Sequence, residues 1–264
     1  MFNLFKSSNK EFEILRKKYK NKSAIILGNG PSLDNLNFEL LKQQDQILTF
    51  ATNRIAGICQ INNWYPDIYS SFFCGPFTGK EYLTPDKKRI NYSGSLEKGI
   101  DAQKDIEYIV KNRDTICFLH HWYKLFLQEQ ENVKFIKPVL WNRFKSFPKN
   151  AFSKYKIPNK FLWHNAVTSL FQICFYIGCK NIAIIGIDGY DINSEKNHFA
   201  HYEGHDMSKK NEKIRANKSI ERLQEAVYIY AKRENINIFN LSESSIIKLY
   251  PKINLNEYLL VSNN

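Results

Sequence analysis

Three short segments of this sequence gather small and polar residues in patterns that suit the binding of a phosphorylated ligand. Gly28-Asn-Gly-Pro-Ser32, Thr52-Asn53 and Gly186-Ile-Asp-Gly-Tyr190 each follow an apolar run. Glycines let a backbone approach a ligand closely, and the N-terminus of a following helix favours a phosphate. The first segment has Leu33 where a dinucleotide loop has its third glycine, and no Gly-Lys-Ser/Thr follows as in a Walker A loop. It is either a nucleotide-binding turn or a plain strand-to-helix turn.

Acid–base and metal chemistry have candidates in the same half of the chain. Asp188 follows an apolar run, a place that suits a metal ligand, a base or a residue that holds a turn. His198, His201 and His205 lie close together, which suits zinc binding or a general base that titrates near neutral pH. Gly204 weakens the helix that would align the three histidines, so the general base is the favoured interpretation.

The strands and helices that position these residues are predicted from apolar runs that alternate with helical patterns. The sequence predicts strands at 23–27, 46–50, 67–70, 115–119, 133–136, 180–185 and 236–240. It predicts helices at 9–22, 33–43, 122–130, 165–177 and 208–235, with Ser32 as the N-cap of the second. This alternation predicts an α/β fold with a largely parallel sheet, whose ligands bind at the carboxyl ends of the strands.

The domain organisation expected from this pattern is simple. A basic helix within residues 1–22 precedes one α/β nucleotide-sugar-binding domain at 23–264. We expect the helix to cap the fold or to touch anionic lipid headgroups. The stretch 77–114 has no clear period and is read as an excursion, whereas the polar, histidine-rich stretch 190–212 is read as a mobile lid.

Composition narrows the class of protein and of partner. The chain has 264 residues, with 38 Lys and Arg against 26 Asp and Glu, a net charge of +12. A positive net charge of this size indicates a nucleic acid, a phosphorylated small molecule or an acidic membrane as partner. Alternatively, the charge serves only to keep the protein in solution. The basic run Lys209 to Lys218 is either a solvated helix face or a source of charge near a phosphate.

No apolar run reaches the roughly eighteen residues of a membrane span, and no signal peptide is evident. The five cysteines form no C-x-x-C pair, which predicts free thiols in a reducing cytosol.

The glycine-rich, aspartate-bearing and histidine-rich segments, taken in their order along the chain, resemble blocks of the bacterial sialyltransferases of glycosyltransferase family 42. Gly28-Asn-Gly-Pro-Ser32 resembles the nucleotide loop of that family, Ile185-Gly-Ile-Asp-Gly-Tyr190 its Gly-Ile-Asp-x-Tyr block, and His201-Tyr-Glu-Gly-His205 its His-Tyr-x-Gly-His block. The stretch 236–240 followed by Ser242-Glu-Ser-Ser245 resembles its last strand and serine-bearing turn. The first two blocks also resemble, more loosely, motility-accessory proteins and a hydroxymethylpterin pyrophosphokinase-like family.

The resemblance implies a Rossmann-like, mostly parallel sheet flanked by helices, a variant of the GT-A fold with a lid. It implies an inverting transfer of sialic acid or a similar acidic sugar from a CMP-activated donor to a cell-surface glycan, without metal or cofactor. His205 would be the general base, and Tyr190 and Tyr202 would assist at the departing phosphate. The residues implied to bind the donor nucleotide are Gly28, Asn29, Gly30, Ser32, Asn53, Asn165, Gly186, Asp188, Ser244 and Ser245.

The sequence leaves several alternatives open. Asn165 and Ala166 stand where the family has the Thr-Ser pair that meets the donor carboxylate, so the donor is sialic acid or another CMP-activated acidic sugar such as Kdo. We expect a cytoplasmic enzyme, peripheral on the inner face of the membrane, with no nucleic-acid partner and with a homo-oligomer left open. The alternative functions are an ATP- and Mg²⁺-dependent pyrophosphokinase-like transferase and a non-catalytic module that binds glycan or nucleic acid.

Overall fold

The structure is a computed structural model. It describes residues 4–72, 81–83, 89–91, 96–140, 147–154, 157, 161–165, 167–194, 198 and 210–262. For 4–11, 81–83, 89–91, 96–98, 139, 140 and 163 the description covers the backbone alone.

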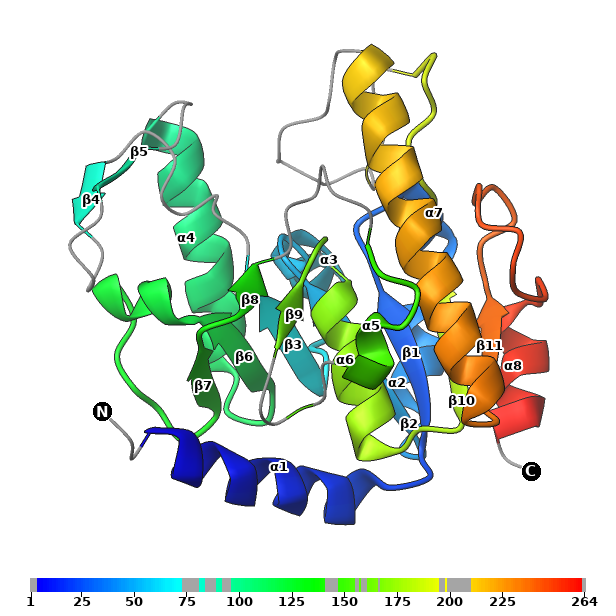
Figure 1. The fold of residues 1–264 in the computed structure, drawn as a ribbon, viewed down its shortest axis with the longest axis horizontal. Helices are drawn as coiled ribbons and strands as arrows, with labels where there is room; N and C mark the ends of the chain where they lie inside the picture. Colours follow the sequence, from blue (N-terminus) through cyan, green and yellow to red (C-terminus); the bar gives the residue numbers. More distant parts are fainter. Residues whose placement is uncertain are drawn as a thin grey trace.

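Seven of the described strands form the main sheet, in the order β11-β10-β1-β2-β3-β6-β7, and every neighbouring pair in it is parallel. The strands are β1 (Ser23–Leu27), β2 (Ile47–Thr52), β3 (Ile68–Ser71), β6 (Ile116–His120), β7 (Val133–Ile136), β10 (Asn181–Ile185) and β11 (Asn237–Asn240). The predicted Rossmann-like parallel sheet is thereby confirmed (Figure 1).

Helices and minor strands fill the connections. The α-helices are α1 (Leu4–Tyr19), α2 (Phe38–Lys42), α3 (Ala56–Asn62), α4 (Leu96–Lys111), α5 (Ala151–Lys154), α6 (Thr168–Ile177), α7 (Lys210–Arg233) and α8 (Leu255–Ser262). Two 3₁₀ helices are η1 (Pro31–Asn35) and η3 (His121–Leu125). Two small sheets pair β4 (Glu81–Leu83) with β5 (Arg89–Asn91) and β8 (Val139–Leu140) with β9 (Leu162–Trp163).

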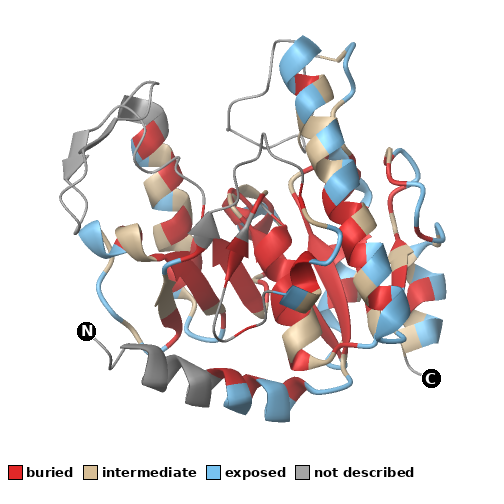
Figure 2. Cartoon of the chain, viewed as in Figure 1, coloured by how far each residue is buried: buried red, intermediate tan, exposed pale blue. Residues whose placement is uncertain are grey.

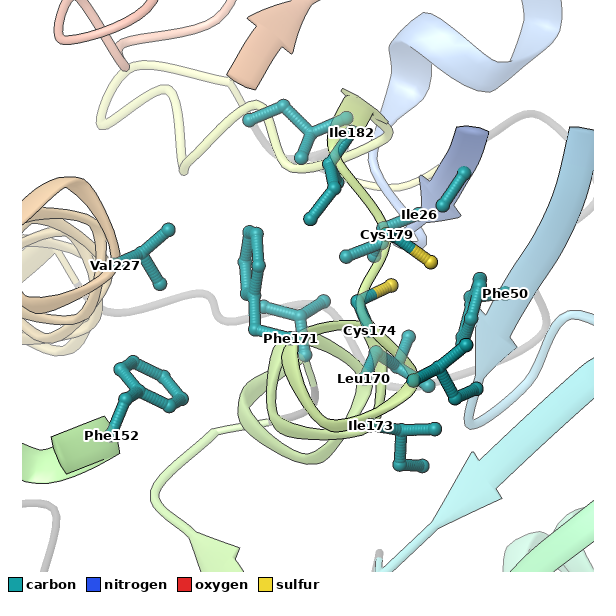
Figure 3. Packing of buried hydrophobic residues seen from close by; sticks show 14 of the residues in the cluster. Ile26, Phe50, Phe152, Leu170, Phe171, Ile173, Cys174, Cys179, Ile182 and Val227 are labelled. Carbon is teal, nitrogen blue, oxygen red and sulfur yellow. The ribbon is translucent and has the colours of Figure 1, made fainter. Parts of the chain in front are cut away.

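Both faces of the sheet are covered, because alternate side chains of each strand point to opposite faces. Ala24 and Ile26 of β1 belong to a core with α1, α5, α6 and α7, whereas Ile25 belongs to a core with α2, α3, α4 and α8. Figure 2 shows the strands as a buried layer, and Figure 3 shows Phe171 of α6 and Val227 of α7 inside the first core. The result is a three-layer sandwich of helices, sheet and helices.

The basic N-terminal helix caps the fold with its apolar side. Phe12 stacks on Phe118 of β6 at a ring-centroid distance of 5.1 Å, and Leu15 and Tyr19 are also buried. In Figure 1 this helix runs across the bottom of the view, below the sheet, and it contacts α6. Phe12, Leu15 and Tyr19 therefore pack inside the protein, whereas Ile14 of the same helix is exposed. Within the described residues, no helix is both long and apolar enough to cross a bilayer.

The structure corrects several predicted helices. Instead of one helix at 33–43, η1 and α2 are separated at Leu36, and the helix predicted at 122–130 is only η3. Ser32 is not an N-cap, since it lies inside η1 and its hydroxyl bonds elsewhere in the fold. Asn37 is the cap instead, because its Oδ1 accepts the Leu40 N–H at 2.9 Å. The polar cap at Asn37 thus divides a segment that periodicity alone joins.

The remaining differences are smaller. The helix predicted at 9–22 corresponds to α1, which begins earlier, at Leu4, and ends earlier, at Tyr19. The helix predicted at 165–177 begins at Thr168, and the excursion at 77–114 contains β4, β5 and α4. The four described cysteines are free thiols, as predicted, and all four are buried: Cys59, Cys117, Cys174 and Cys179. The fifth, Cys74, lies outside the described residues.

Candidate functional site

The topology singles out one position on the sheet. From β1 the chain builds β2, β3, β6 and β7 outward on one side, then returns to place β10 and β11 on the other side of β1. The connections that leave β1 and β10 therefore turn to opposite faces. Ligands of open α/β sheets bind at such a reversal, outside the carboxyl ends of the strands. Two of the segments singled out in the sequence follow these two strands.

Backbone contacts join the loops that follow β1 and β10. The Gly28 N–H donates to the Ile185 carbonyl at 2.8 Å, and the Gly30 N–H donates to the Gly186 carbonyl at 2.7 Å. A Cβ on Gly28 would lie 2.1 Å from the Gly186 carbonyl oxygen, and one on Gly30 would lie 2.4 Å from an Asp188 carboxylate oxygen. The glycines thus have a packing reason that the sequence did not reveal, because the two loops approach too closely for any side chain.

Ser32 and Asp188 complete this junction. The Ser32 hydroxyl donates to Asp188 Oδ1 at 2.8 Å, and the Ser32 N–H donates to Asp188 Oδ2 at 2.8 Å. The same hydroxyl oxygen accepts the Gly186 N–H at 2.8 Å. Both side chains are buried, with 7% of Ser32 and 6% of Asp188 exposed. We call these three residues the Ser32–Asp188 clamp.

The loop after β11 joins the same junction. The Ser245 hydroxyl donates to the Ile187 carbonyl at 3.1 Å, and the Ile246 N–H donates to the Asp188 carbonyl at 2.9 Å. Ser244, in contrast, is exposed, and its hydroxyl contacts that of Ser242 at 3.4 Å. The three adjacent loops after β1, β10 and β11 therefore form one rigid unit.

Asn29 and Asn53 lie on the other side of β1, toward β2. The Asn29 amide donates to the Thr52 carbonyl at 3.2 Å, while its Oδ1 is buried without a hydrogen-bond partner among the described residues. Asn53 follows β2 with a φ of +52°, a left-handed conformation that asparagine adopts more readily than most residues. Asn29 thus keeps an acceptor available to a ligand beside the clamp.

Asn165 lies in the turn before α6. Its Oδ1 accepts the Val167 N–H at 3.3 Å and the Thr168 hydroxyl at 3.1 Å, which shapes the start of the helix. Its Nδ2 is buried and lacks a hydrogen-bond partner within the described part of the chain. Ser169, the second residue of α6, hydrogen-bonds Ser70 of β3, with 2.8 Å between the two hydroxyl oxygens, so α6 begins at the carboxyl edge of the sheet. Ala166, which follows Asn165, lies outside the described residues.

Of the predicted catalytic residues, the structure describes only Tyr190. Tyr190 follows the clamp, and its ring meets that of His198 edge-on at 6.0 Å between centroids. His201, Tyr202 and His205 lie outside the described residues. No group of three or more His, Cys, Asp or Glu side chains suited to a metal ion occurs in the described part of the chain.

His164 is a residue that the sequence reading missed. It is 6% exposed, its Nε2 lies 2.9 Å from the Ser219 hydroxyl of α7, and Phe147 packs on its ring. Burial lowers the pKa of His164 to about 4, against a hydrogen bond with Ser219 that raises it. The imidazole is therefore neutral at pH 7. A single histidine beside a predicted helix start carries no pattern that could have revealed it.

A second group of buried polar residues secures the loop after β2. Arg54, 6% exposed, forms an ion pair with Asp105 of α4. At the end of β6, His120 Nδ1 accepts the Trp122 N–H at 3.2 Å. Burial, with the nearby His121 and Lys137, lowers the pKa of His120 to about 3. These contacts fix the loops that follow β2 and β6 at the carboxyl edge of the sheet.

No model of a protein family matches the sequence, and no curated protein is a significant match. One similar solved structure is described as the MAf glycosyltransferase from Magnetospirillum magneticum AMB-1. The two are 13% identical, with a TM-score of 0.47 over 96% of this chain and 41% of that chain. This chain thus spans about two-fifths of the length of that protein.

Proposed function

We propose that this protein is a glycosyltransferase that moves sialic acid or a similar acidic sugar from a CMP-activated donor to a hydroxyl of a glycan acceptor. The observation that carries the proposal is the junction at β1 and β10. It brings Gly28–Ser32, Gly186–Tyr190 and Ser242–Ser245 together, three segments that resemble the donor-site blocks of the sialyltransferases. These segments are far apart in sequence, so their meeting at the one reversal of strand order supports a shared ligand.

The proposed donor site uses polar groups that the fold leaves available. Asn29 Oδ1 is a buried acceptor beside the clamp, and it suits a ribose hydroxyl or a base amino group. Asn165 Nδ2 is a buried donor at the start of α6, and it suits a carboxylate or phosphate oxygen. Buried polar groups without partners are rare in folded proteins, which makes a ligand a reasonable partner for both.

The proposed reaction is a single displacement. The oxygen of the acceptor hydroxyl attacks the anomeric carbon, the bond from that carbon to the phosphate oxygen breaks, and CMP leaves with the bonding electrons. His205 takes the acceptor proton, and Tyr190 and Tyr202 donate hydrogen bonds to the phosphate as its charge grows. Both oxygens of Asp188 already accept hydrogen bonds from Ser32. In this proposal Asp188 therefore shapes the site and has no part in proton transfer.

A peripheral contact with an anionic membrane is the second part of the proposal. Four basic side chains are exposed: Arg16, Lys17 and Lys18 of α1, and Lys20, which follows the helix. Phe12, Leu15 and Tyr19 of the same helix are buried. The contact is therefore electrostatic, without insertion of the helix. Each basic residue near such a surface contributes about 1 kcal/mol.

The test is a thermal-shift panel of CMP, CDP, UDP, GDP and ATP, each with Mg²⁺ and with EDTA. At a hundredfold excess over Kd, CMP should stabilise the fold by about 2.7 kcal/mol, which raises Tm by about 5–10 °C. The shift should persist in EDTA and should be lost in Asn29→Ala, with the exposed Asn35→Ala as matched control. A shift produced by Mg²⁺-ATP alone would instead support the pyrophosphokinase-like function, and no shift at all would refute a nucleotide site.

A further inference from the structure

The long helix α7 carries polar residues on the side that faces the protein. Lys213, Asn217 and Gln224 are spaced by four and seven residues, so they lie along one face of the helix. Lys213 and Gln224 are buried, and all three hydrogen-bond other segments of the chain. A helix of this length normally turns apolar residues inward. Two of the three polar residues, Lys213 and Asn217, bond the segment that follows Asp188.

Asn217 holds the peptide groups of Tyr190 from both sides. Its Oδ1 accepts the Tyr190 N–H at 2.7 Å, and its Nδ2 donates to the Tyr190 carbonyl at 2.8 Å. The preceding Gly189 has a φ of +83°, and a Cβ there would lie 2.4 Å from Ile246 and 3.2 Å from Asn217 Oδ1. The backbone around Tyr190 is thus enclosed between α7 and the loop after β11.

Lys213 holds the residues that follow. Its ammonium donates to the carbonyls of Asp191 and Ser194, and only 3% of its surface is exposed. A buried ammonium needs several hydrogen bonds to offset its lost hydration, and here two backbone carbonyls provide them. One turn of helix separates Lys213 from Asn217. Together they fix both ends of the Tyr190–Ser194 segment on α7.

We propose that Asn217 and Lys213 are positioning residues that set the conformation of the Tyr190 segment and hence the aim of its phenol group. The inference rests on the proposed function, in which Tyr190 meets the departing phosphate. A hydrogen-bond donor displaced by a small distance loses most of its stabilisation of the developing charge. Substitution at Asn217 should therefore slow transfer without weakening the binding of CMP, because Asn217 is not among the proposed donor contacts Asn29 and Asn165.

The first arm of the test needs no substrate. Hydrogen exchange of the Tyr190 amide is measured in the wild type, Asn217→Ala and Asn217→Asp, with the exposed Asn211→Ala on the same helix as matched control. Loss of one backbone-amide hydrogen bond should speed exchange about tenfold in Asn217→Ala. Asn217→Asp keeps an acceptor and should retain most of the protection. Unchanged exchange in Asn217→Ala would overturn the inference.

The second arm measures transfer with a CMP-activated sugar. In Asn217→Ala we expect kcat to fall about tenfold, with the donor KM and the CMP-induced Tm shift changed less than about twofold. Lys213→Met should behave similarly, and the exposed Lys218→Met should resemble the wild type. A fall in CMP binding that matches the fall in kcat would overturn the positioning role. If the wild type fails to bind CMP, the proposed function fails, whereas the exchange arm still decides whether Asn217 orders Tyr190.

Discussion

The hydroxyl of Ser32 and the carboxylate of Asp188 are 156 residues apart in sequence and hydrogen-bond at 2.8 Å, where the order of strands reverses. The pair lies beyond the carboxyl ends of β1 and β10, at the edge of the sheet where α/β proteins bind their ligands. Because Ser32 also accepts the Gly186 N–H, one hydroxyl holds both loops. The shape of the candidate donor site thus depends on this contact.

Asp188→Asn should destabilise the protein and reduce the binding of CMP. The substitution replaces one carboxylate oxygen by an NH₂ group, which is a hydrogen-bond donor. That NH₂ group then faces either the N–H or the hydroxyl of Ser32, both of which donate to Asp188 in the wild type. Hydrogen bonds to a charged group are worth about 1.5–3 kcal/mol, so the free energy of unfolding should fall by about 2 kcal/mol. Urea denaturation measures the loss, with the exposed Asp45→Asn as control. Equal stability of Asp188→Asn and wild type would show that the clamp contributes nothing.

His205→Ala should abolish transfer while leaving the binding of CMP nearly intact. The reason is that a general base accelerates the chemical step and does not hold the donor nucleotide. Release of CMP from a CMP-activated sugar measures transfer, and the thermal shift measures binding. Turnover retained in this variant would move the base elsewhere, and His201 is the next candidate.

Protein stability should fall as the pH drops below neutrality, in part because of His164. The unfolded chain takes up a proton at His164 near its ordinary pKa of 6.5, but the folded chain does so only near 4. Stability is therefore complete above about pH 6.5 and is lost as the pH falls toward 4. Between pH 7 and 5 the loss from this residue is about 2 kcal/mol.

The variant His164→Gln isolates that contribution. Glutamine does not titrate and still reaches toward the Ser219 hydroxyl, so the fall in unfolding free energy from pH 7 to 5 should be about 2 kcal/mol smaller than in the wild type. Urea denaturation at the two pH values provides the comparison. An identical pH dependence in the two proteins would exclude a neutral, buried His164.

The double variant Lys17→Glu, Lys20→Glu should bind anionic vesicles more weakly than the wild type, with unchanged stability. Both side chains are exposed, so their reversal removes attraction to the surface without disturbing the buried Phe12 and Tyr19. Cosedimentation with vesicles of phosphatidylglycerol and phosphatidylcholine measures binding. The control is Lys232→Glu, Lys248→Glu, an equal change of charge elsewhere on the surface. Equal losses in both double variants would indicate net charge alone as the cause.

Much of the fold could be read from the sequence because its strands are local signals. The runs at 23–27 and 133–136 match β1 and β7 residue for residue, since both are short, rich in β-branched or aromatic residues and bounded by polar ones. The segment at 33–43 was wrongly predicted as one helix, because its apolar spacing continues from η1 into α2. In the structure Asn37 caps α2 and thereby begins a separate helix. The two-residue strands β8 and β9 are too short for any periodicity to indicate.

The sequence by itself determined the strands of the main sheet, the parallel α/β class and the candidate segments, since apolar periodicity and glycine- or asparagine-rich turns act over a few neighbouring residues. Only the tertiary structure decided that β10 lies beside β1, and hence that Asp188 meets Ser32 and that Asn217 holds Tyr190. Pairing between distant strands depends on how the whole sheet buries its two faces, and single side chains such as Ser32 carry no local mark of a partner 156 residues away.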